Sequence, residues 1–307
     1  IVQVDIFLVA RQKRMRTRLL FVQIAITLIF VSLYCLSHRG FKERWWLEQQ
    51  RGPREGSKNM QIYMKNFQTF DKAIVYDFKL GDGGIGDYVK FFMIILTYCM
   101  NNNLRFYHKV NNIEIEKYLK LKYDALNITE NEISKLRYVA IKTPYDFYNS
   151  VHYNYNTQLA QVFYFDERVI LNVNSILPSP PCSYIAVHLR LGDKFLETEK
   201  NFVLVKNDTR TFSEEKMDAF IEQNDEQILF FCDNETYKQK MKAKHANLVI
   251  TTSEIGHTSL SNTTNRQILD AVTELYVLSN SRLIYAASES GFSKIASKFN
   301  DVELISP

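Results

Sequence analysis

The chain has 307 residues, of which 46% are hydrophobic and 13% aromatic, a composition that supports a large core and excludes disordered and fibrous proteins. The net charge is +4, but residues 1–58 carry eleven Lys or Arg against four acids, so this segment is +7 and the remainder is −3. The basic balance belongs to the N-terminal segment, and nothing in the charge of the globular part favours nucleic acid as a partner.

Residues 19–36 are the first predicted element, an uncharged run that reads LLFVQIAITLIFVSLYCL. At about 1.5 Å per residue, it is just long enough to cross a thin bilayer. Five cations precede it in residues 11–18, so the positive-inside rule predicts a cytosolic basic tail over 1–18 and a lumenal remainder. A cleaved signal peptide is the alternative, but no small-residue cleavage site follows the run. We expect a single-pass signal anchor.

Residues 37–70 are charged and rich in Gln, contain Gly and Pro, and show no apolar period, so they are predicted to form a stem. Beyond the stem, the cysteines are Cys99, Cys182 and Cys232, which allow one disulfide at most. No Cys or His pattern has metal spacing, so no metal site is expected. Sequons that fit a secreted or lumenal glycoprotein begin at Asn127, Asn207, Asn234 and Asn262.

Residues 71–177 alternate strand-like and helix-like segments and are predicted to form an N-terminal Rossmann-like lobe. The expected order is strand Lys72–Phe78, helix Tyr88–Met100, strand Leu104–Tyr107, amphipathic helix Ile113–Leu121 and strand Arg137–Ile141. The stretch 143–174, rich in Tyr and Asn, has no firm assignment.

Three prolines within residues 178–181 mark a boundary, because they suit neither a helix nor a central strand. Residues 178–307 then form a second predicted lobe. Strands are expected at Ser183–Leu189, Gln227–Cys232, Leu248–Thr251 and Leu283–Ala287, with helices at Ser213–Gln223, Glu235–Lys244, Asn265–Ser279 and Ser290–Phe299, the last leading to Val302–Ile305. This alternation predicts an α/β fold of two parallel-sheet lobes, with ligands at the carboxyl ends of the strands.

The most informative segment is residues 184–193, where an apolar strand leads to His188, Arg190 and the turn Gly192-Asp193. Alternation along the strand places His188 and Arg190 on one side, about 7 Å apart. The planar fork of an Arg bonds two oxygens of a diphosphate at once. The alternative is a buried strand that ends in a surface Arg–Asp ion pair.

A glycine-rich loop, Gly81-Asp82-Gly83-Gly84-Ile85-Gly86, follows the first strand and opens the apolar helix. It satisfies the GxGxxG pattern, so an NAD(P)-binding lobe is an alternative. Against it, the acid expected on the ribose about twenty residues later is missing, because the next strand ends in aromatic and cationic residues. A simple strand-to-helix turn is a third possibility.

Each of the other candidate residues has a purely structural interpretation beside the functional one. Asp233 follows a strand and can read guanine or cap the next helix. Ser290, Gly291 and Phe292 can hold phosphate oxygens at a helix N-terminus or form an N-cap. Asp270 and Glu274 share a helix face and are expected to be solvated, and His257 is expected to be exposed.

Together these segments resemble the GT-B fucosyltransferases with an HxRxGD motif, a group that includes α1,2-, α1,6- and protein O-fucosyltransferases and bacterial nodulation enzymes. The residues that carry the resemblance are His188-Leu189-Arg190-Leu191-Gly192-Asp193, Gly83-Gly84-Ile85-Gly86-Asp87-Tyr88 and Ser290-Gly291-Phe292-Ser293. Two positions depart from the pattern. Asp87 stands where the family commonly has Asn, and Leu191 replaces the second Arg of the α1,2 subgroup.

The resemblance implies a metal-independent, inverting transfer of fucose from GDP-fucose to a glycan or glycoprotein, in a type II protein of the Golgi membrane. It implies that the first lobe serves the acceptor and that the second binds the nucleotide sugar. Arg190 would hold the β-phosphate beside His188 and Asp193, Asp233 would read guanine, and Ser290, Gly291 and Phe292 would complete the phosphate site. Asp87 or Glu289 is a candidate base. An NAD(P)-dependent lumenal oxidoreductase and a non-catalytic, membrane-anchored glycan-binding relative stay open as alternatives.

Overall fold

The computed structural model describes residues 60–111, 113–147, 159–177, 183–192, 210–254 and 256–306. All of them belong to one compact unit, Gly56–Pro307. The predicted tail and anchor of residues 1–36 and the motif residue Asp193 lie outside the described residues. Across the described ranges, no helix combines the length and the apolar character that crossing a membrane requires.

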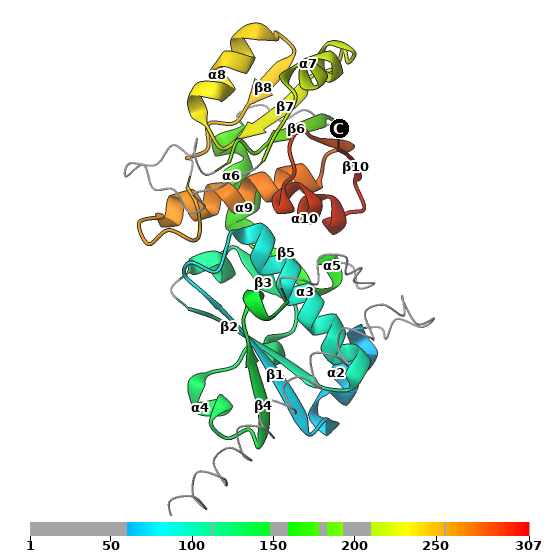
Figure 1. Cartoon of the computed structure of the whole chain (residues 1–307), viewed down its shortest axis with the longest axis vertical. Helices are drawn as coiled ribbons and strands as arrows, with labels where there is room; N and C mark the ends of the chain where they lie inside the picture. The colour runs from blue at the N-terminus through cyan, green and yellow to red at the C-terminus, as the bar shows by residue number, and fades with distance from the viewer. Residues whose placement is uncertain are drawn as a thin grey trace, which may run out of the picture. The chain divides into compact units, whose positions relative to one another are not determined.

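The first sheet has three parallel strands in the order β2-β1-β4, formed by β1 (Lys72–Lys79), β2 (Arg105–Asn111) and β4 (Tyr138–Lys142). Helix α3 (Ile85–Asn102) packs on β1 and β2 (Figure 1). Its apolar residues cover most of its circumference, so nearly the whole helix is buried. Three short elements complete this part of the chain: η3 (Asp124–Leu126), α4 (Glu130–Ile133) and η4 (Pro144–Phe147).

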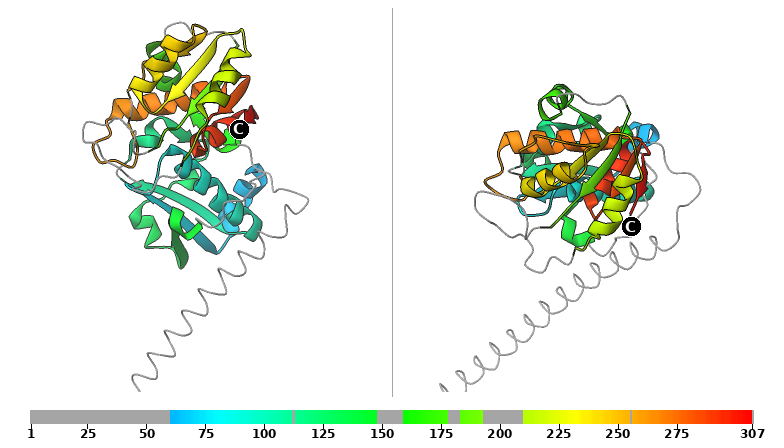
Figure 2. Two further views of the ribbon diagram at one scale, coloured as in Figure 1. Left: turned by 45° about the horizontal axis from the view of Figure 1, so that its top comes forward. Right: turned by 90° about the horizontal axis from the view of Figure 1, so that it is seen from above.

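The second sheet has five parallel strands in the order β10-β9-β6-β7-β8. The strands are β6 (Ile185–Leu189), β7 (Ile228–Cys232), β8 (Leu248–Ile250), β9 (Leu283–Ala286) and β10 (Glu303–Ile305). Helices α7 (Glu214–Glu222) and α8 (Glu235–Lys244) cover one face, and α9 (Asn265–Ser279) and α10 (Gly291–Phe299) the other (Figures 1 and 2). Alternate strand residues such as Val187 and Phe230 pack under α7 and α8, which leaves His188 on the α10 face. The expected alternation of parallel strands and helices is present.

Residues 113–121 differ from the expected amphipathic helix. They form the 3₁₀ turn η2 (Glu114–Lys117) followed by β3 (Leu119–Leu121), which pairs antiparallel with β5 (Phe163–Phe165). Leu119 and Leu121 are buried on either side of Lys120, a period of two that suits a strand. The pairing partner lies in a stretch with no firm assignment, so the short apolar pattern was interpreted as a helix. That prediction was wrong.

The predicted stem, 37–70, also ends earlier than expected. Residues 60–69 form α2 (Met60–Asn66) and the 3₁₀ turn η1 (Phe67–Thr69), which pack into the core. Met60, Tyr63 and Phe67 make one buried stripe with helical spacing. The hydroxyl of Tyr63 donates to the carbonyl of Leu104 at 2.7 Å and accepts from the N–H of Phe106 at 2.8 Å. These bonds tie α2 to the start of β2.

Two helices that were not predicted lie in the described range 159–177: α5 (Leu159–Val162) and α6 (Glu167–Ile176). The side chain of Asp166 caps α6 by accepting from the N–H of Arg168. Helix α6 packs along α9, where the buried amide of Asn172 donates to Asp270 at 2.8 Å and to Thr273 at 3.0 Å. One side of α9 is therefore covered by protein.

Candidate functional site

A cavity of about 460 Å³ lies where the carboxyl ends of strands from both sheets meet. Residues that follow β1, β4, β6, β7, β8 and β9 line it, among them Gly81 to Asp87, Tyr145, His188, Arg190, Arg210, Asp233, His257, Glu274 and Ser290 to Phe292. The volume is typical of sites for small molecules and cofactors. The structure thus brings together the three motifs that sequence analysis singled out, with Asp193 outside the described residues.

Arg190 stands at the end of β6 with its backbone held in place. Its N–H donates to Ser288 Oγ at 2.9 Å, and the Ser288 hydroxyl donates back to the carbonyl of Arg190 at 2.8 Å. Its guanidinium donates from Nη1 to Asp233 Oδ2 at 2.6 Å, and both side chains are at most 15% exposed. The ion pair is therefore mostly buried and faces the cavity, unlike the surface Arg–Asp pair that was the alternative prediction for this strand end.

The carboxylate oxygens of Asp233 accept hydrogen bonds from the turn that follows Arg190. It accepts from the N–H of Leu191 at 2.8 Å and from that of Gly192 at 3.4 Å, in addition to Arg190. The cap of α8 is Asn234, whose side chain accepts from the N–H of Tyr237 at 2.7 Å. Asp233 therefore orders the Arg190 turn and is not the helix cap.

His188 is buried one strand position before the end of β6. Its Nδ1 lies 2.7 Å from Ser293 Oγ, and its ring stacks on that of Phe292 with centroids 5.5 Å apart. Burial, assisted by the positive charge of Arg190, lowers the pKa of His188 to about 3. The imidazole is neutral at working pH, and it fixes the start of α10 to the strand that carries Arg190.

The N-termini of α3 and α10 differ in what occupies them. At α3, the N–H of Gly84 donates to Asp87 Oδ2 at 3.3 Å, so a carboxylate of the chain already sits there. A Cβ on Gly83 would lie 2.6 Å from that oxygen, which explains the glycine. At α10, the cap is the neutral hydroxyl of Ser290, and the first turn contains no acid. The open end for an anion is that of α10.

Gly86 allows α3 and α10 to touch. A Cβ at this position would lie 2.9 Å from the carbonyl carbon of Gly291 and from the nitrogen of Phe292. Real Cβ atoms are not found so close to backbone, so only glycine fits without displacement of a helix. Gly86, the last glycine of the loop, is therefore a packing glycine between the helices of the two sheets.

Asp87 faces the same cavity as Arg190. Burial raises its pKa, while the Gly84 N–H, Lys90, Arg210 and Arg190 act in the opposite direction. A buried carboxyl with a raised pKa is a stronger proton acceptor when ionised. Among the cations near it, Arg210 was not predicted, and no local pattern in the sequence marks it.

Glu274 is the main site residue that sequence analysis missed. It was expected on a solvated face of its helix, but it lines the cavity and its Oε1 accepts from the hydroxyls of Thr251, at 2.6 Å, and of Ser253. Burial raises the pKa of Glu274. Asp270, its expected partner on that face, is fully buried and bonded to Asn172. The solvated-face prediction was wrong.

The loop after β8 supplies further polar groups. The hydroxyls of Thr258 and Ser259 are buried, line the cavity and have no hydrogen-bond partner among the described residues. His257 was expected to be exposed, but it is half-buried, and burial with the charges of Arg190 and Arg210 lowers its pKa to about 3. Nothing local in this polar loop distinguishes a cavity wall from a surface turn. In the described ranges, no cluster of three metal-ligating side chains occurs, and Cys99 and Cys232 are free thiols.

No protein-family model matches the chain, and no curated protein is similar to it. Among solved structures, NodZ α1,6-fucosyltransferase co-crystallised with GDP matches with 7% identity and a TM-score of 0.43, over 74% of this chain and 91% of that one. A mutant of FUT1 from Arabidopsis thaliana in complex with GDP matches with 11% identity and a TM-score of 0.45, over 87% and 77%. NodZ from Bradyrhizobium matches with 7% identity and a TM-score of 0.42, over 74% and 92%. Each TM-score is below 0.5.

Proposed function

We propose that this chain is a glycosyltransferase that transfers fucose from GDP-fucose to a glycan or glycoprotein acceptor. The observation that carries the proposal is one cavity shared by Arg190, the open N-terminus of α10 and the buried carboxyl of Glu274. A diphosphate, a purine with two adjacent donors and a sugar each find matching groups there. The resemblance of the motifs around Arg190, Gly84 and Ser290 points to the same substrate.

The diphosphate is assigned to Arg190 and the start of α10. Phosphate oxygens can replace the Asp233 oxygen that Arg190 now holds at 2.6 Å, while Asp233 keeps the N–H of Leu191. The helix N-terminus adds backbone N–H groups and a favourable dipole. Negative charge grows on GDP as the sugar–phosphate bond breaks, and preorganised donors of this kind stabilise it by a few kcal/mol each. No metal is required in this scheme.

Recognition of the guanine base of GDP is assigned to Glu274, in place of Asp233. Guanine presents N1–H and its 2-amino group side by side, and a carboxylate accepts both. Thr251 and Ser253 bond to Oε1 of Glu274 and so orient the carboxyl. Donors on the ligand favour the ionised form and offset the burial that raises the pKa of Glu274. Uracil and cytosine lack this pair of adjacent donors.

The transfer step is assigned to the region around Asp87. An acceptor hydroxyl attacks C1 of fucose, the bond from C1 to the phosphate oxygen breaks, and its electron pair leaves with GDP. Asp87 accepts the hydroxyl proton, and attack from the opposite face inverts the anomeric carbon. The unpartnered hydroxyls of Thr258 and Ser259 are available to the hydroxyls of the sugar. We further propose that residues 19–36 anchor the protein in the Golgi membrane with the described residues in the lumen.

The oxidoreductase alternative would place a dinucleotide on the loop from Gly81 to Gly86. The Asp87 carboxylate already bonds to the Gly84 N–H there, and β2 ends in Lys109, Val110 and Asn111 without an acid for a ribose. Both observations favour the nucleotide sugar. A non-catalytic glycan-binding protein would keep the fold and would not respond to GDP.

A melting-temperature titration of the full chain with GDP, UDP, CMP and NAD tests the proposal, because a ligand that binds only the folded state raises the melting temperature. We expect GDP to stabilise the protein much more than the other three ligands and Arg190→Ala to abolish the shift. Stabilisation by NAD would move the function to the oxidoreductase alternative. Silence toward all four, in a protein that melts cooperatively, would favour the non-catalytic one.

A further inference from the structure

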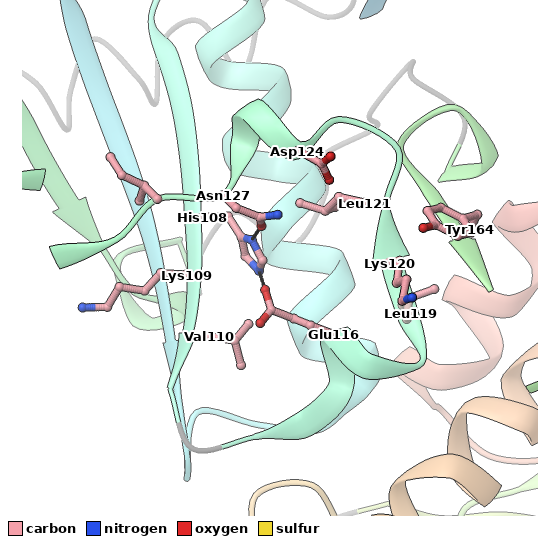
Figure 3. Close-up of a pocket in the computed structure, with 11 residues that line it drawn as sticks. His108, Lys109, Val110, Glu116, Leu119, Lys120, Leu121, Asp124, Asn127 and Tyr164 are labelled. Carbon is pink, nitrogen blue, oxygen red and sulfur yellow. Dashed lines mark hydrogen bonds and ion pairs between the residues drawn. The ribbon is translucent and has the colours of Figure 1, made fainter. Parts of the chain in front are cut away.

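A second cavity, of about 470 Å³, lies beside β2 (Figure 3). Its wall is formed by β2, η2, β3, η3 and β5, and none of the residues that line it also line the cavity at Arg190. The polar and aromatic residues that line it are His108, Lys109, Glu116, Lys120, Asp124, Asn127 and Tyr164. The proposed function gives this cavity no role.

Buried hydrogen bonds determine which groups face this cavity. Tyr88 lies on α3 and its hydroxyl is 2.8 Å from His108 Nε2, while His108 Nδ1 is 3.2 Å from Asn127 Oδ1. The amide oxygen of Asn127 can only accept, so Nδ1 of His108 carries the imidazole proton and donates to it. Nε2 therefore accepts from the hydroxyl of Tyr88. The amide nitrogen of Asn127 is left as a donor at the cavity.

Two carboxyls supply acceptors. Oε1 of Glu116 lies 3.4 Å from His108 Nε2, on the side of the ring opposite Asn127 (Figure 3). Nε2 carries no proton and already accepts from Tyr88, so it donates no hydrogen bond to Glu116. The oxygens of Glu116 are therefore available to accept from a ligand. Asp124 comes from η3, and its carboxylate bonds to no side chain in the described part of the protein. Donors and acceptors thus converge on one space.

The charges of the cavity disfavour anions. Lys109 points away from it and pairs with Asp77 and Glu130, and Lys120 pairs with Asp166 at 2.7 Å. The lysines are therefore already neutralised by acids outside the cavity, whereas Glu116 and Asp124 pair with no Lys or Arg of the described ranges. An anionic ligand would meet two carboxyls without compensation.

Tyr164 completes the wall with an apolar surface. Its side chain lies across the cavity from His108 and is 43% exposed, although it is a large aromatic residue. A pyranose has an apolar face of C–H groups and a rim of hydroxyls that both donate and accept. An exposed aromatic ring beside a carboxylate, a carboxyl and an amide matches these two features together.

We propose that this cavity binds a neutral sugar unit of a glycan, at a site distinct from the nucleotide cavity. The binding of the sugar is independent of the proposed function, and only its interpretation as a subsite for the acceptor rests on it. Tyr164 stacks on the ring, and Asp124 and Glu116 accept from hydroxyls. His108 is a positioning residue that bonds to Asn127, and Tyr88 holds His108 in place.

The test uses the full chain, made in a host without N-glycosylation and held in a detergent without a sugar headgroup, so that Asn127 is free and no detergent competes. Lactose, N-acetyllactosamine and N,N′-diacetylchitobiose are titrated by calorimetry, up to about 20 mM, beside sialyllactose as the anionic counterpart. At least one neutral sugar should bind, and sialyllactose should bind more weakly than lactose. Tyr164→Ala and Asp124→Ala should each weaken binding about 10-fold or more, with the melting temperature unchanged. Tyr138→Ala, an exposed tyrosine on β4, is the matched control and should have no effect.

GDP binding, followed in the same samples, separates the two proposals. A protein that shows the GDP shift and binds no neutral sugar would overturn the second site and leave the proposed function intact. Sugar binding that Tyr164→Ala abolishes in a protein blind to GDP would support the second site and sink the proposed function. Binding that survives both Tyr164→Ala and Asp124→Ala lies elsewhere and would also overturn the site.

Discussion

The two cavities are nearly equal in volume, about 460 and 470 Å³, and acids line both, but they differ in the cations that they present. The cavity at Arg190 combines a guanidinium, Arg210 and the open N-terminus of α10. The cavity at His108 presents Glu116 and Asp124, and its lysines are paired with acids elsewhere. Volume does not distinguish the ligands of these sites, whereas the arrangement of charges assigns an anion to one and a neutral polyol to the other.

Helix α3 connects the two cavities through consecutive residues. Asp87 faces the nucleotide cavity, and Tyr88 bonds to His108 in the other. Both belong to the first turn of α3, whose position depends on the contact of Gly86 with α10. The two sites therefore share one structural support, and substitutions can separate their chemistry from that support.

Removal of the guanidinium should have the largest effect. Arg190→Ala is expected to lower turnover of GDP-fucose by about 100- to 1000-fold, because a donor that stabilises charge on the leaving group is lost. Arg190→Lys keeps the charge without the bidentate fork, so its turnover should lie between that of the unaltered protein and that of Arg190→Ala. Steady-state kinetics on folded variants measure this. Near-normal turnover in Arg190→Ala would assign the anion to other groups and erase the electrostatic contrast between the cavities.

Glu274→Gln should change the choice of base. Loss of a charged acceptor is expected to weaken GDP binding by about 10- to 100-fold and to leave weak binding of UDP unchanged, which narrows selectivity. Glu222→Gln is the control, because Glu222 is an exposed acid that lines neither cavity. Competition titrations with GDP and UDP measure both. Equal losses for the two nucleotides would show that Glu274 supports the loop instead of reading the base.

Gly86→Ala tests the shared support. The added methyl would lie 2.9 Å from backbone atoms of α10, so we expect a loss of about 1–3 kcal/mol in the free energy of unfolding. Gly291→Ala is the control across the same contact, because its Cβ would have no atom within 4 Å. Denaturant unfolding of both variants gives the comparison. Equal stability of the two would mean that α3 and α10 do not touch as described.

The smallest expected effect is the acid sensitivity that His108 contributes. Burial lowers its pKa to about 4, so between this value and its ordinary pKa the unfolded chain binds a proton that the folded chain does not. The free energy of unfolding must then fall as the pH falls, by on the order of 1–2 kcal/mol between about pH 7 and pH 5. In His108→Gln this part of the slope should disappear. Comparison of the two slopes is needed, since His188 and His257 act in the same direction and Glu274 in the opposite one.

Local sequence signals predicted the second sheet better than the first. The bounds of α8 and α9 agree with the prediction, because Asn234 and Thr264 cap them and apolar spacing defines their cores. The strand of Leu119 and Leu121 depends on pairing with Phe163 and Phe165, which is a tertiary contact. Sequence patterns of three residues do not report such pairings.

In the candidate site too, the residues whose positions depend on tertiary contacts could not be predicted. His188, Arg190 and Ser290 could be predicted to meet because parallel strands end at one edge of a sheet. Glu274 was misplaced because α6, which covers the neighbouring Asp270, was itself not predicted, so this side of α9 was interpreted as solvated. Asp233 was interpreted from its place in the sequence, but its bonds to Arg190 and Leu191 became visible only in three dimensions.

The most direct test of the central claim, that Arg190 and the start of α10 form a diphosphate site, is calorimetric titration of the full chain with GDP and with GMP. The two ligands share the base and the ribose, and only GDP carries the β-phosphate. We predict that GDP binds about 100-fold more tightly, and that Arg190→Ala reduces the difference to about tenfold or less. Equal affinities of the unaltered protein for GDP and GMP would contradict the account.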